Sequence, residues 1–282
     1  MDKKISFLGA GSMAEALISG LAAREGSHPE NIWISNRSND TQLARLQQEY
    51  GVTPSRDLSS LLNGSDVVII AVKPKDVLAI LTQVKKYLRK DMLLISVAAG
   101  ISTASLKSIV EIDMPIIRAM PNTSAAVGKS ATALCGNEYV KDKDKQLAKE
   151  IFGTVGMAVY TEEDKMDAVT GLSGSGPAYI YYLIEAMQQS AEQIGLEPQD
   201  AQRLIIQTLM GAAEMVHTSD KTPQTLRKEV TSPGGTTEAG IRILEEKGVK
   251  EALIECIKTA THRSSEMGED LSKKISQGIL SN

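Results

Sequence analysis

The chain has 282 residues, 42% of them hydrophobic, and a formal net charge of −4. This length supports one large or two modest cores, and the scattered lysines and arginines do not form the basic stripe typical of a nucleic-acid-binding surface. The first residues lack the apolar core of a signal peptide, and charges interrupt every other apolar segment before about 18 residues, so we expect a cytoplasmic protein without a transmembrane helix.

The chain begins with the pattern of a dinucleotide-binding fold. An apolar run at 4–8 is followed by GAGSMA at 9–14 and then by an apolar helical pattern. In the spacing G-x-G-x-x-A, Gly9 permits a tight turn, Gly11 lets a pyrophosphate approach the backbone, and Ala14 lets the helix pack closely on the strand. The N-terminus of that helix adds free N–H groups and a positive dipole end for the phosphates.

The second expected strand, at 31–35, indicates which dinucleotide binds. A strict NAD site places an acid at the end of this strand, to accept hydrogen bonds from the ribose 2′-hydroxyl. Here the strand is followed by Asn36, Arg37 and Ser38. A guanidinium suits a 2′-phosphate, so this segment favours NADPH, with NADH still possible and a solvated arginine as the alternative interpretation of Arg37.

Further strands are expected to complete a doubly wound, mostly parallel sheet. Apolar, β-branched runs stand at 66–72, 93–97, 115–119 and 155–160, and helical stretches separate most of them. Three of the runs end in AVKP, SVAAG and AMPNT, which we expect at one sheet edge, where ligands bind in such folds. The small residues and prolines there suit a flat nicotinamide ring, and Asn122 and Thr123 can supply polar contacts.

The strand signals stop after about residue 162, and helical patterns follow. Helices are expected after the SGSGP segment at 173–177, over 199–215 and in parts of 241–257, with apolar residues on more than one face. Such helices are buried either in their own bundle or against a partner chain, and we favour a homodimer. We therefore divide the chain into a Rossmann domain at 1–162 and an all-α domain at 163–282 for dimerisation and substrate binding.

The segment VTSPGGTTEAG at 230–240 combines a turn with a helix start. The first N–H groups of a helix have no internal partner, and Gly234 and Gly235 let a ligand approach without meeting a Cβ. A small carboxylate would fit there, next to the hydroxyls of Thr236 and Thr237. An ordinary helix capped by Ser232 or Thr236 explains the spacing equally well.

Taken in order, GAGSMA, AVKP, AMPNT, GLSGSGPAY and VTSPGGTTEAGIRILE closely resemble pyrroline-5-carboxylate reductase, the last enzyme of proline biosynthesis. The resemblance runs over nearly the whole chain, and SPGGTT is its most family-specific part. It implies that an N-terminal Rossmann domain binds NAD(P)H and that a helical domain interlocks with that of a second subunit. Dimers of this family often assemble into decamers, and each active site lies between a cofactor domain and helices of the dimer domain.

The resemblance also implies roles for individual residues. Cofactor contacts are implied at the pyrophosphate (Gly9, Gly11, Ser12, Met13), at the 2′-phosphate (Asn36, Arg37, Ser38), along the ribose and nicotinamide (Ala71, Val72, Lys73, Pro74, Ala98) and near the ring (Asn122). For the substrate carboxylate, the resemblance implies binding by Ser232, Gly234, Gly235, Thr236 and Thr237. The hydroxyl of Thr237 faces the ring nitrogen, which makes Thr237 the implied catalytic residue.

The implied chemistry needs neither a histidine nor a carboxylic acid as the proton donor. A cyclic imine is basic enough to take its proton from water, and the resulting iminium is the better hydride acceptor. We therefore expect structural roles for His28, His217 and His262. Neither Cys135 nor Cys256 lies in a CxxC or Cys/His pattern, so we expect two reduced, buried thiols and no metal site.

Two other functions stay open from the sequence, besides reduction of a related imino acid. A β-hydroxyacid dehydrogenase of similar build needs a lysine as an acid on a C-terminal helix. Lys165, Lys221 and Lys228 are available, but none has the glycine-serine context of that site. A non-catalytic, nucleotide-sensing regulator would be expected to carry a degraded substrate loop, whereas SPGGTT is intact.

Overall fold

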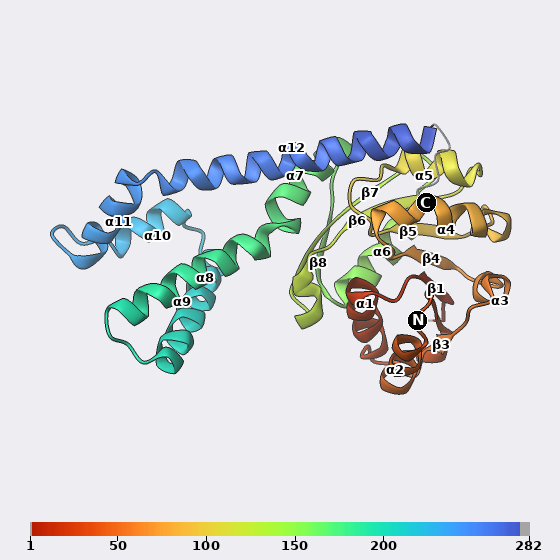
Figure 1. Cartoon of the computed structure of the whole chain (residues 1–282), viewed down its shortest axis with the longest axis horizontal. Coiled ribbons are helices and arrows are strands. Elements are labelled where there is room, and N and C mark those ends of the chain that lie inside the picture. The colour runs from red at the N-terminus through yellow and green to blue at the C-terminus, as the bar shows by residue number, and fades with distance from the viewer. Residues whose placement is uncertain (1, 277–282) are drawn as a thin grey trace. The chain divides into compact units, whose positions relative to one another are not determined.

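The computed structural model describes residues 2–276, and contacts group the chain into two units (Figure 1). Unit 1 comprises the residues up to Gly176 together with those from Thr259 onward, and unit 2 comprises Pro177–Lys258. This grouping differs from a division at residue 162, which marks instead where the strands end. None of the helices among residues 2–276 is long and apolar enough to cross a membrane.

Unit 1 is built on one eight-stranded sheet in the order β3-β2-β1-β4-β5-β6-β7-β8. Neighbouring strands are parallel except for the β6–β7 pair. The expected doubly wound, mostly parallel sheet is therefore confirmed. The strands are β1 (Ile5–Leu8), β2 (Ile32–Ser35), β3 (Thr53–Pro54), β4 (Val67–Ile70), β5 (Leu93–Ser96), β6 (Ile116–Met120), β7 (Ser130–Gly136) and β8 (Gly156–Tyr160).

Strands β3 and β7 are absent from the sequence-based expectation. β7 runs antiparallel to β6 because only residues 121–129 join them, and a parallel return needs a crossover of about a dozen residues or more. The longer connection from β7 to β8 contains a helix, and that pair is parallel. β3 has two residues at the sheet edge, and one of them is Pro54.

Helices cover both faces of the sheet. Leu17, Leu46 and Phe152 pack on one face and come from α1 (Ser12–Ala22), α2 (Asp40–Tyr50) and α6 (Asp142–Gly153). The other face is covered by α3 (Leu58–Leu62), α4 (Val77–Val84) and α5 (Thr103–Val110), joined there by Ile275 near the end of the chain. Short 3₁₀ turns lie at 29–31, 74–76, 85–87, 123–127 and 163–165.

Up to Ser276, only helices and helical turns follow β8. They are α7 (Met166–Val169), a π-helical turn (Thr170–Gly174), α8 (Gly176–Gln193), α9 (Pro198–Thr218), α10 (Pro223–Glu229), α11 (Thr236–Glu246) and α12 (Val249–Ser276). The helical pattern expected over parts of 241–257 is divided at Gly248, whose φ of +66° separates α11 from α12. α10 was not expected from the sequence.

Unit 2 has little core of its own. All of residues 177–258 are described, and the only hydrophobic ones buried there are Ala191, Ala201 and Ile205. Large apolar side chains on α8, α9, α11 and α12 are exposed instead, among them Tyr182 at 76% and Leu204 at 59%. Exposed apolar faces of this kind are typical of surfaces that bind a partner.

Candidate active site

The first glycine of GAGSMA lies where the strand order reverses, between β1 and β4. Gly9 has a φ of +113°, and a Cβ there would overlap the carbonyl oxygen of Ala71. Its N–H donates to the carbonyl of Ser35, with an N–O distance of 2.8 Å. The tight turn expected at Gly9 is therefore present, at the point where doubly wound sheets bind their ligands.

The second glycine leaves open space at the start of α1. Gly11 is the N-cap residue of α1 and makes no side-chain cap, and a Cβ placed on it would meet no atom within 4 Å. Gly11 and Ser12 are exposed and Met13 is half-buried, whereas Ala14 is fully buried against the core. The fold itself does not need a glycine at position 11. The open backbone fits the close approach of a pyrophosphate to the helix N-terminus.

A carboxylate in the first turn of α1 is held by a distant arginine. Arg45 Nη2 lies 2.6 Å from Glu15 Oε2, and Gln42 donates to the same oxygen over 3.1 Å. The hydrogen bond from Arg45 holds the pKa of Glu15 below its ordinary value. This pair offsets negative charge beside the expected phosphates. Thirty residues separate its members, so no local spacing signals it.

The loop after β2 presents Arg37 to solvent. Asn36 closes this loop on itself, because its amide donates to the carbonyl of Asn39 over 2.6 Å and accepts from the N–H of Asn39 over 3.1 Å. The guanidinium of Arg37 has no hydrogen-bond or ion-pair partner among the described residues. The nearby carboxylate of Asp40 is paired with Arg56, which also donates to the carbonyl of Arg37. This arrangement fits a 2′-phosphate.

The three strand-end segments lie at one edge of the sheet, because β4, β5 and β6 are parallel neighbours. After β4, Lys73 is exposed, while Ala71, Val72 and Pro74 are half-buried. Ala98, after β5, is 3% exposed and packs in the core. The edge therefore offers a mostly small-residue backbone surface.

The side-chain amide of Asn122, after β6, makes hydrogen bonds within the protein. It is 8% exposed. Its amide nitrogen donates to the carbonyl of Ser173 over 3.0 Å, and its amide oxygen accepts from the N–H of Ser124 over 3.2 Å. Ser173 belongs to the π-helical turn, a feature that occurs often at functional sites. The sequence pattern indicated a helix start here but neither the π turn nor its bond to Asn122.

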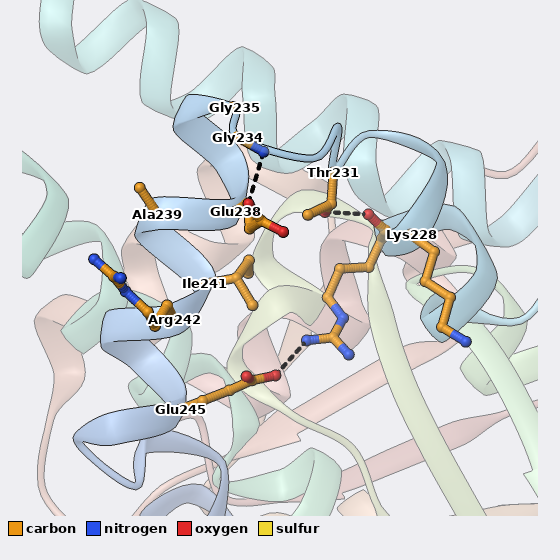
Figure 2. A pocket seen from close by; sticks show the side chains of 10 residues that line it. Lys228, Thr231, Gly234, Gly235, Glu238, Ala239, Ile241, Arg242 and Glu245 are labelled. Atoms are coloured by element: carbon orange, nitrogen blue, oxygen red, sulfur yellow. Dashed lines mark hydrogen bonds and ion pairs between the residues drawn. The ribbon is translucent and has the colours of Figure 1, made fainter.

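In unit 2, the loop before α11 has the expected turn but an unexpected cap (Figure 2). Gly234 has a φ of +72°, which favours glycine. The N-cap residue of α11 is Gly235, and no side chain caps the helix, so neither Ser232 nor Thr236 plays that part. The N–H of Gly234 donates instead to the carboxylate of Glu238 over 2.7 Å, and that of Gly235 donates to the carbonyl of Ser232 over 3.0 Å.

The next two residues have unpaired backbone amides in the described part of the chain. Thr236 and Thr237 are the first residues of α11, both are exposed, and their N–H and hydroxyl groups have no hydrogen-bond partner within the described part of the chain. A helix start of this kind attracts anions. The predicted carboxylate site therefore keeps two of its backbone donors, whereas Glu238 occupies a third.

A cavity of about 630 Å³ lies beside this loop, between α10 and α11. Gly234, Gly235 and Glu238 line it together with Arg227, Lys228, Thr231, Ala239, Ile241, Arg242 and Glu245. Arg227 and Glu245 are ion-paired at 3.2 Å. Neither Ser232 nor Thr237 lines this cavity.

The remaining candidate groups for catalysis lie apart from these segments. His28, His217 and His262 are all exposed. Burial raises the pKa of Cys135 to about 12, which keeps its thiol protonated. Cys256 is also a free thiol, but it is exposed, so the expectation of a buried side chain was wrong for this residue. Among residues 2–276, no group of three or more histidine, cysteine or acidic side chains is arranged to hold a metal ion.

Comparison with known proteins finds close relatives over the full length. The family described as pyrroline-5-carboxylate reductase dimerisation matches residues 163–267, and that described as NADP oxidoreductase coenzyme F420-dependent matches residues 4–100. Pyrroline-5-carboxylate reductase 2 of Bacillus subtilis is 45% identical over 95% of this chain and 96% of its own.

Solved structures match as well. A pyrroline-5-carboxylate reductase from Coxiella burnetii is 38% identical, with a TM-score of 0.87 over 95% of this chain and 99% of its own. A pyrroline carboxylate reductase from Plasmodium falciparum, determined with NADP bound, is 31% identical, with a TM-score of 0.86 over 95% of this chain and 98% of its own.

Proposed function

The chain belongs to the pyrroline-5-carboxylate reductase family, and from that premise we propose how its own residues carry out the reaction. It reduces 1-pyrroline-5-carboxylate to L-proline, the last step of proline biosynthesis. When bound, NAD(P)H supplies the hydride that reduces the protonated imine. One observation supports the assignment of residues to the site. The helices that begin after Gly11 and Gly235 both lack a side-chain cap at their N-terminus, where an anion can bind.

We propose that NADPH is the preferred cofactor. Gly9, Gly11, Ser12 and Met13 hold the pyrophosphate at the start of α1, and the open space at Gly11 supports this. The 2′-phosphate is held by Arg37 and Ser38, on a loop that Asn36 closes. The support is the exposed guanidinium of Arg37, which has no partner within residues 2–276. Asp40 is paired with Arg56, and a free carboxylate there would repel the phosphate. The family match to NADP-dependent oxidoreductases agrees with this preference.

The nicotinamide end is assigned to the sheet edge after β4, β5 and β6. Ala71, Val72, Lys73 and Pro74 form one side of this site and Ala98 another. The amide of Asn122 already donates to Ser173 and accepts from Ser124, so we assign it the role of shaping the edge through these two residues.

The substrate carboxylate is assigned to Ser232, Gly234, Gly235, Thr236 and Thr237. The exposed amides of Thr236 and Thr237 at the positive end of α11 support this assignment. The imine nitrogen takes its proton from water. The hydroxyl of Thr237 then orients that nitrogen and hydrogen-bonds the nascent amine, so catalysis comes mainly from positioning.

The working assembly is proposed to be a homodimer, or a decamer built of such dimers. The exposed apolar faces of α8, α9, α11 and α12 support it, as does the match of residues 163–267 to a dimerisation family. A partner covering these faces supplies the core that unit 2 lacks as a single chain.

The test is a steady-state assay with pyrroline-5-carboxylate, using NADPH and NADH side by side. We expect turnover with this substrate and a higher kcat/KM with NADPH. A higher rate with a six-membered imino acid would favour reduction of a related imino acid. A higher rate with a β-hydroxyacid and NADP⁺ would favour the dehydrogenase alternative. Failure to complement a proline auxotroph by a folded, NADPH-binding protein would favour a regulator.

A further inference from the structure

A carboxylate of α11 holds the turn that precedes this helix. Glu238 Oε2 accepts a hydrogen bond from the N–H of Gly234, with an N–O distance of 2.7 Å (Figure 2). Both residues belong to unit 2 and lie four positions apart, so the contact is local to the loop. The chemistry of imine reduction by itself gives this carboxylate no part, and its bond to the loop therefore calls for another reason.

The bond selects one of two forms of the turn before α11. The N–H of Gly235 donates to the carbonyl of Ser232 over 3.0 Å, which closes a four-residue β-turn. Proline suits the second position of type I and type II turns, whereas the φ of +72° at Gly234 belongs to type II. A glycine also adopts the negative φ of type I, and the two forms differ by a flip of the Pro233–Gly234 peptide. Because Glu238 accepts from the N–H of that peptide, its carboxylate favours type II.

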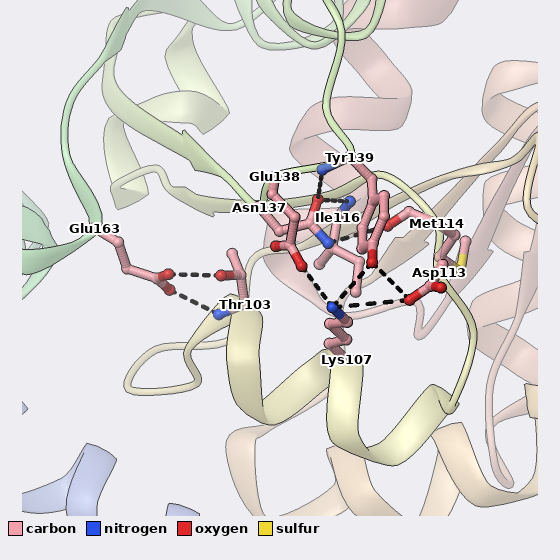
Figure 3. Close-up of polar contacts among 9 residues, drawn as sticks. All are labelled: Thr103, Lys107, Asp113, Met114, Ile116, Asn137, Glu138, Tyr139 and Glu163. Carbon is pink, nitrogen blue, oxygen red and sulfur yellow. Dashed lines mark hydrogen bonds and ion pairs between the residues drawn. The ribbon is translucent and has the colours of Figure 1, made fainter.

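A carboxylate at the start of α5 makes the same kind of bond in a different place. Glu163 accepts from the N–H and the hydroxyl of Thr103, the first residue of α5, over 2.7 and 2.6 Å (Figure 3). It therefore occupies the helix start itself. Glu238 accepts instead from the residue before the N-cap of α11, and the amides of Thr236 and Thr237 keep no partner in the described part of the chain. The bond of Glu238 thus orders the loop and leaves the helix start open.

We propose that Glu238 is a positioning residue for the substrate carboxylate. By holding the Pro233–Gly234 peptide, it fixes where Ser232 lies relative to the open amides of α11. Ser232 is packed closely there, since a Cβ on Gly235 would be 3.0 Å from the Ser232 carbonyl oxygen. This role rests on the proposed function, in which the loop binds that carboxylate. A loop that is ordered before binding spares the substrate the cost of ordering it.

The negative charge of Glu238 acts in the opposite direction, because it repels the substrate carboxylate. The side chain is exposed, so water and salt screen this repulsion. Lys228 and Arg242 line the same cavity as Glu238 and offset its charge further. We therefore expect the ordering of the loop to outweigh the repulsion. A glutamine separates the two effects, because it keeps an acceptor oxygen at the same reach and removes the charge.

The test compares Glu238→Ala and Glu238→Gln with Glu246→Ala as the matched control. Glu246 is the last residue of α11, is exposed, and pairs with Arg242 at 3.8 Å, at the end of the helix away from the loop. Glu238→Ala should raise the KM for pyrroline-5-carboxylate about threefold to tenfold. The kcat and the Kd for NADPH should stay within about twofold, because the loop holds the carboxylate alike in the ground state and the transition state. Glu238→Gln and Glu246→Ala should stay within about twofold of wild type in all three values.

Hydrogen exchange reports on the turn directly. Exchange over 232–237 should become faster in Glu238→Ala and stay unchanged in Glu246→Ala, and unchanged exchange in Glu238→Ala would overturn the ordering role of the bond. A KM that falls in Glu238→Ala and Glu238→Gln alike would show that repulsion prevails, and would overturn the positioning role. An active wild type with an unchanged KM in Glu238→Ala would refute this role alone. A wild type that does not reduce pyrroline-5-carboxylate would refute the proposed function, and this role with it.

Discussion

Gly9 and Ala71 meet where the sheet order reverses, and a Cβ on Gly9 would overlap the Ala71 carbonyl oxygen. Since Gly9 also has a φ of +113°, Gly9→Ala is strained twice over. We expect it to lower the free energy of unfolding by about 2–4 kcal/mol, which urea denaturation measures.

A substitution at Gly11 is predicted to weaken cofactor binding and to leave the stability of the protein unchanged. A Cβ on Gly11 would meet nothing within 4 Å in the protein. Gly11→Ala should therefore keep the wild-type Tm and lose at least about tenfold in NADPH affinity, because the added methyl group lies where the pyrophosphate approaches. Titration of the two variants with NADPH checks this. Equal destabilisation of both, or full NADPH affinity in Gly11→Ala, would contradict the assigned roles.

Arg37 is predicted to set the preference between the two nicotinamide cofactors. Its exposed guanidinium has no partner in the described part of the chain, so Arg37→Ala should remove only the 2′-phosphate contact. We expect kcat/KM for NADPH to fall about tenfold or more, while the value for NADH stays within about twofold. Arg24→Ala is the control, because Arg24 is also exposed but pairs at 3.6 Å with Glu150. A parallel loss with both cofactors would mean that Arg37 does not read the phosphate.

Arg45 is predicted to support cofactor binding without touching the cofactor. In Arg45→Met, Glu15 loses the bond that lowers its pKa, so its pKa rises towards the ordinary value while the group stays ionised at pH 7. The carboxylate then opposes the pyrophosphate, and we expect NADPH affinity to fall about twofold to fivefold. This loss should shrink as the pH falls towards the raised pKa, where Glu15 becomes neutral. Glu15→Gln/Arg45→Met should restore affinity at pH 7, and an unrestored double variant would argue against this cause.

The exposed apolar faces of unit 2 predict the oligomeric state. Light scattering should give twice the mass of one chain or a multiple of that dimer. A charge in an apolar interface loses its hydration, so Leu204→Glu should shift the protein towards the monomer. Val127→Glu, at a residue of unit 1 that is 75% exposed, should leave the mass unchanged. A wild-type monomer at micromolar concentration would exclude the proposed assembly.

The sequence predicted those parts of the molecule whose signals are local. The runs that became β1, β4 and β5 are mostly apolar because helices cover both faces of the sheet, and only β1 and β5 bury one serine each. β7 escaped prediction because it buries Ser130 and Thr132, whose hydroxyls lie 3.1 Å apart and satisfy each other. Its polar residues therefore look like those of a loop.

The candidate site also has parts that the sequence predicts and parts that it does not. The glycine spacing of α1 and the SPGGTT turn are contiguous and could be predicted. The bonds of Arg45 to Glu15 and of Asn122 to Ser173 join residues 30 and 51 positions apart. A single sequence carries no signal for such pairs, because side-chain partners across the fold are chosen by tertiary packing.

Thr237 carries the most specific prediction about the reaction. Its side chain is exposed and has no hydrogen-bond partner among the described residues, so replacing it costs the folded chain little. Thr237→Val keeps the shape and removes the hydroxyl, whereas Thr237→Ser keeps the hydroxyl and removes a methyl group. If the hydroxyl orients the imine nitrogen, Thr237→Val should lower kcat about tenfold or more, and Thr237→Ser should recover most of it.

Binding measurements separate this role from a general defect. The Kd for NADPH and the Tm should stay at wild-type values in both variants, because Thr237 belongs to α11 and the cofactor is assigned to the Rossmann fold. Thr237→Ala should behave like Thr237→Val, since both lack the hydroxyl. A Thr237→Val enzyme that reduces pyrroline-5-carboxylate at the wild-type rate would leave the hydroxyl without a catalytic part. The backbone amides of α11 would then account for substrate orientation by themselves.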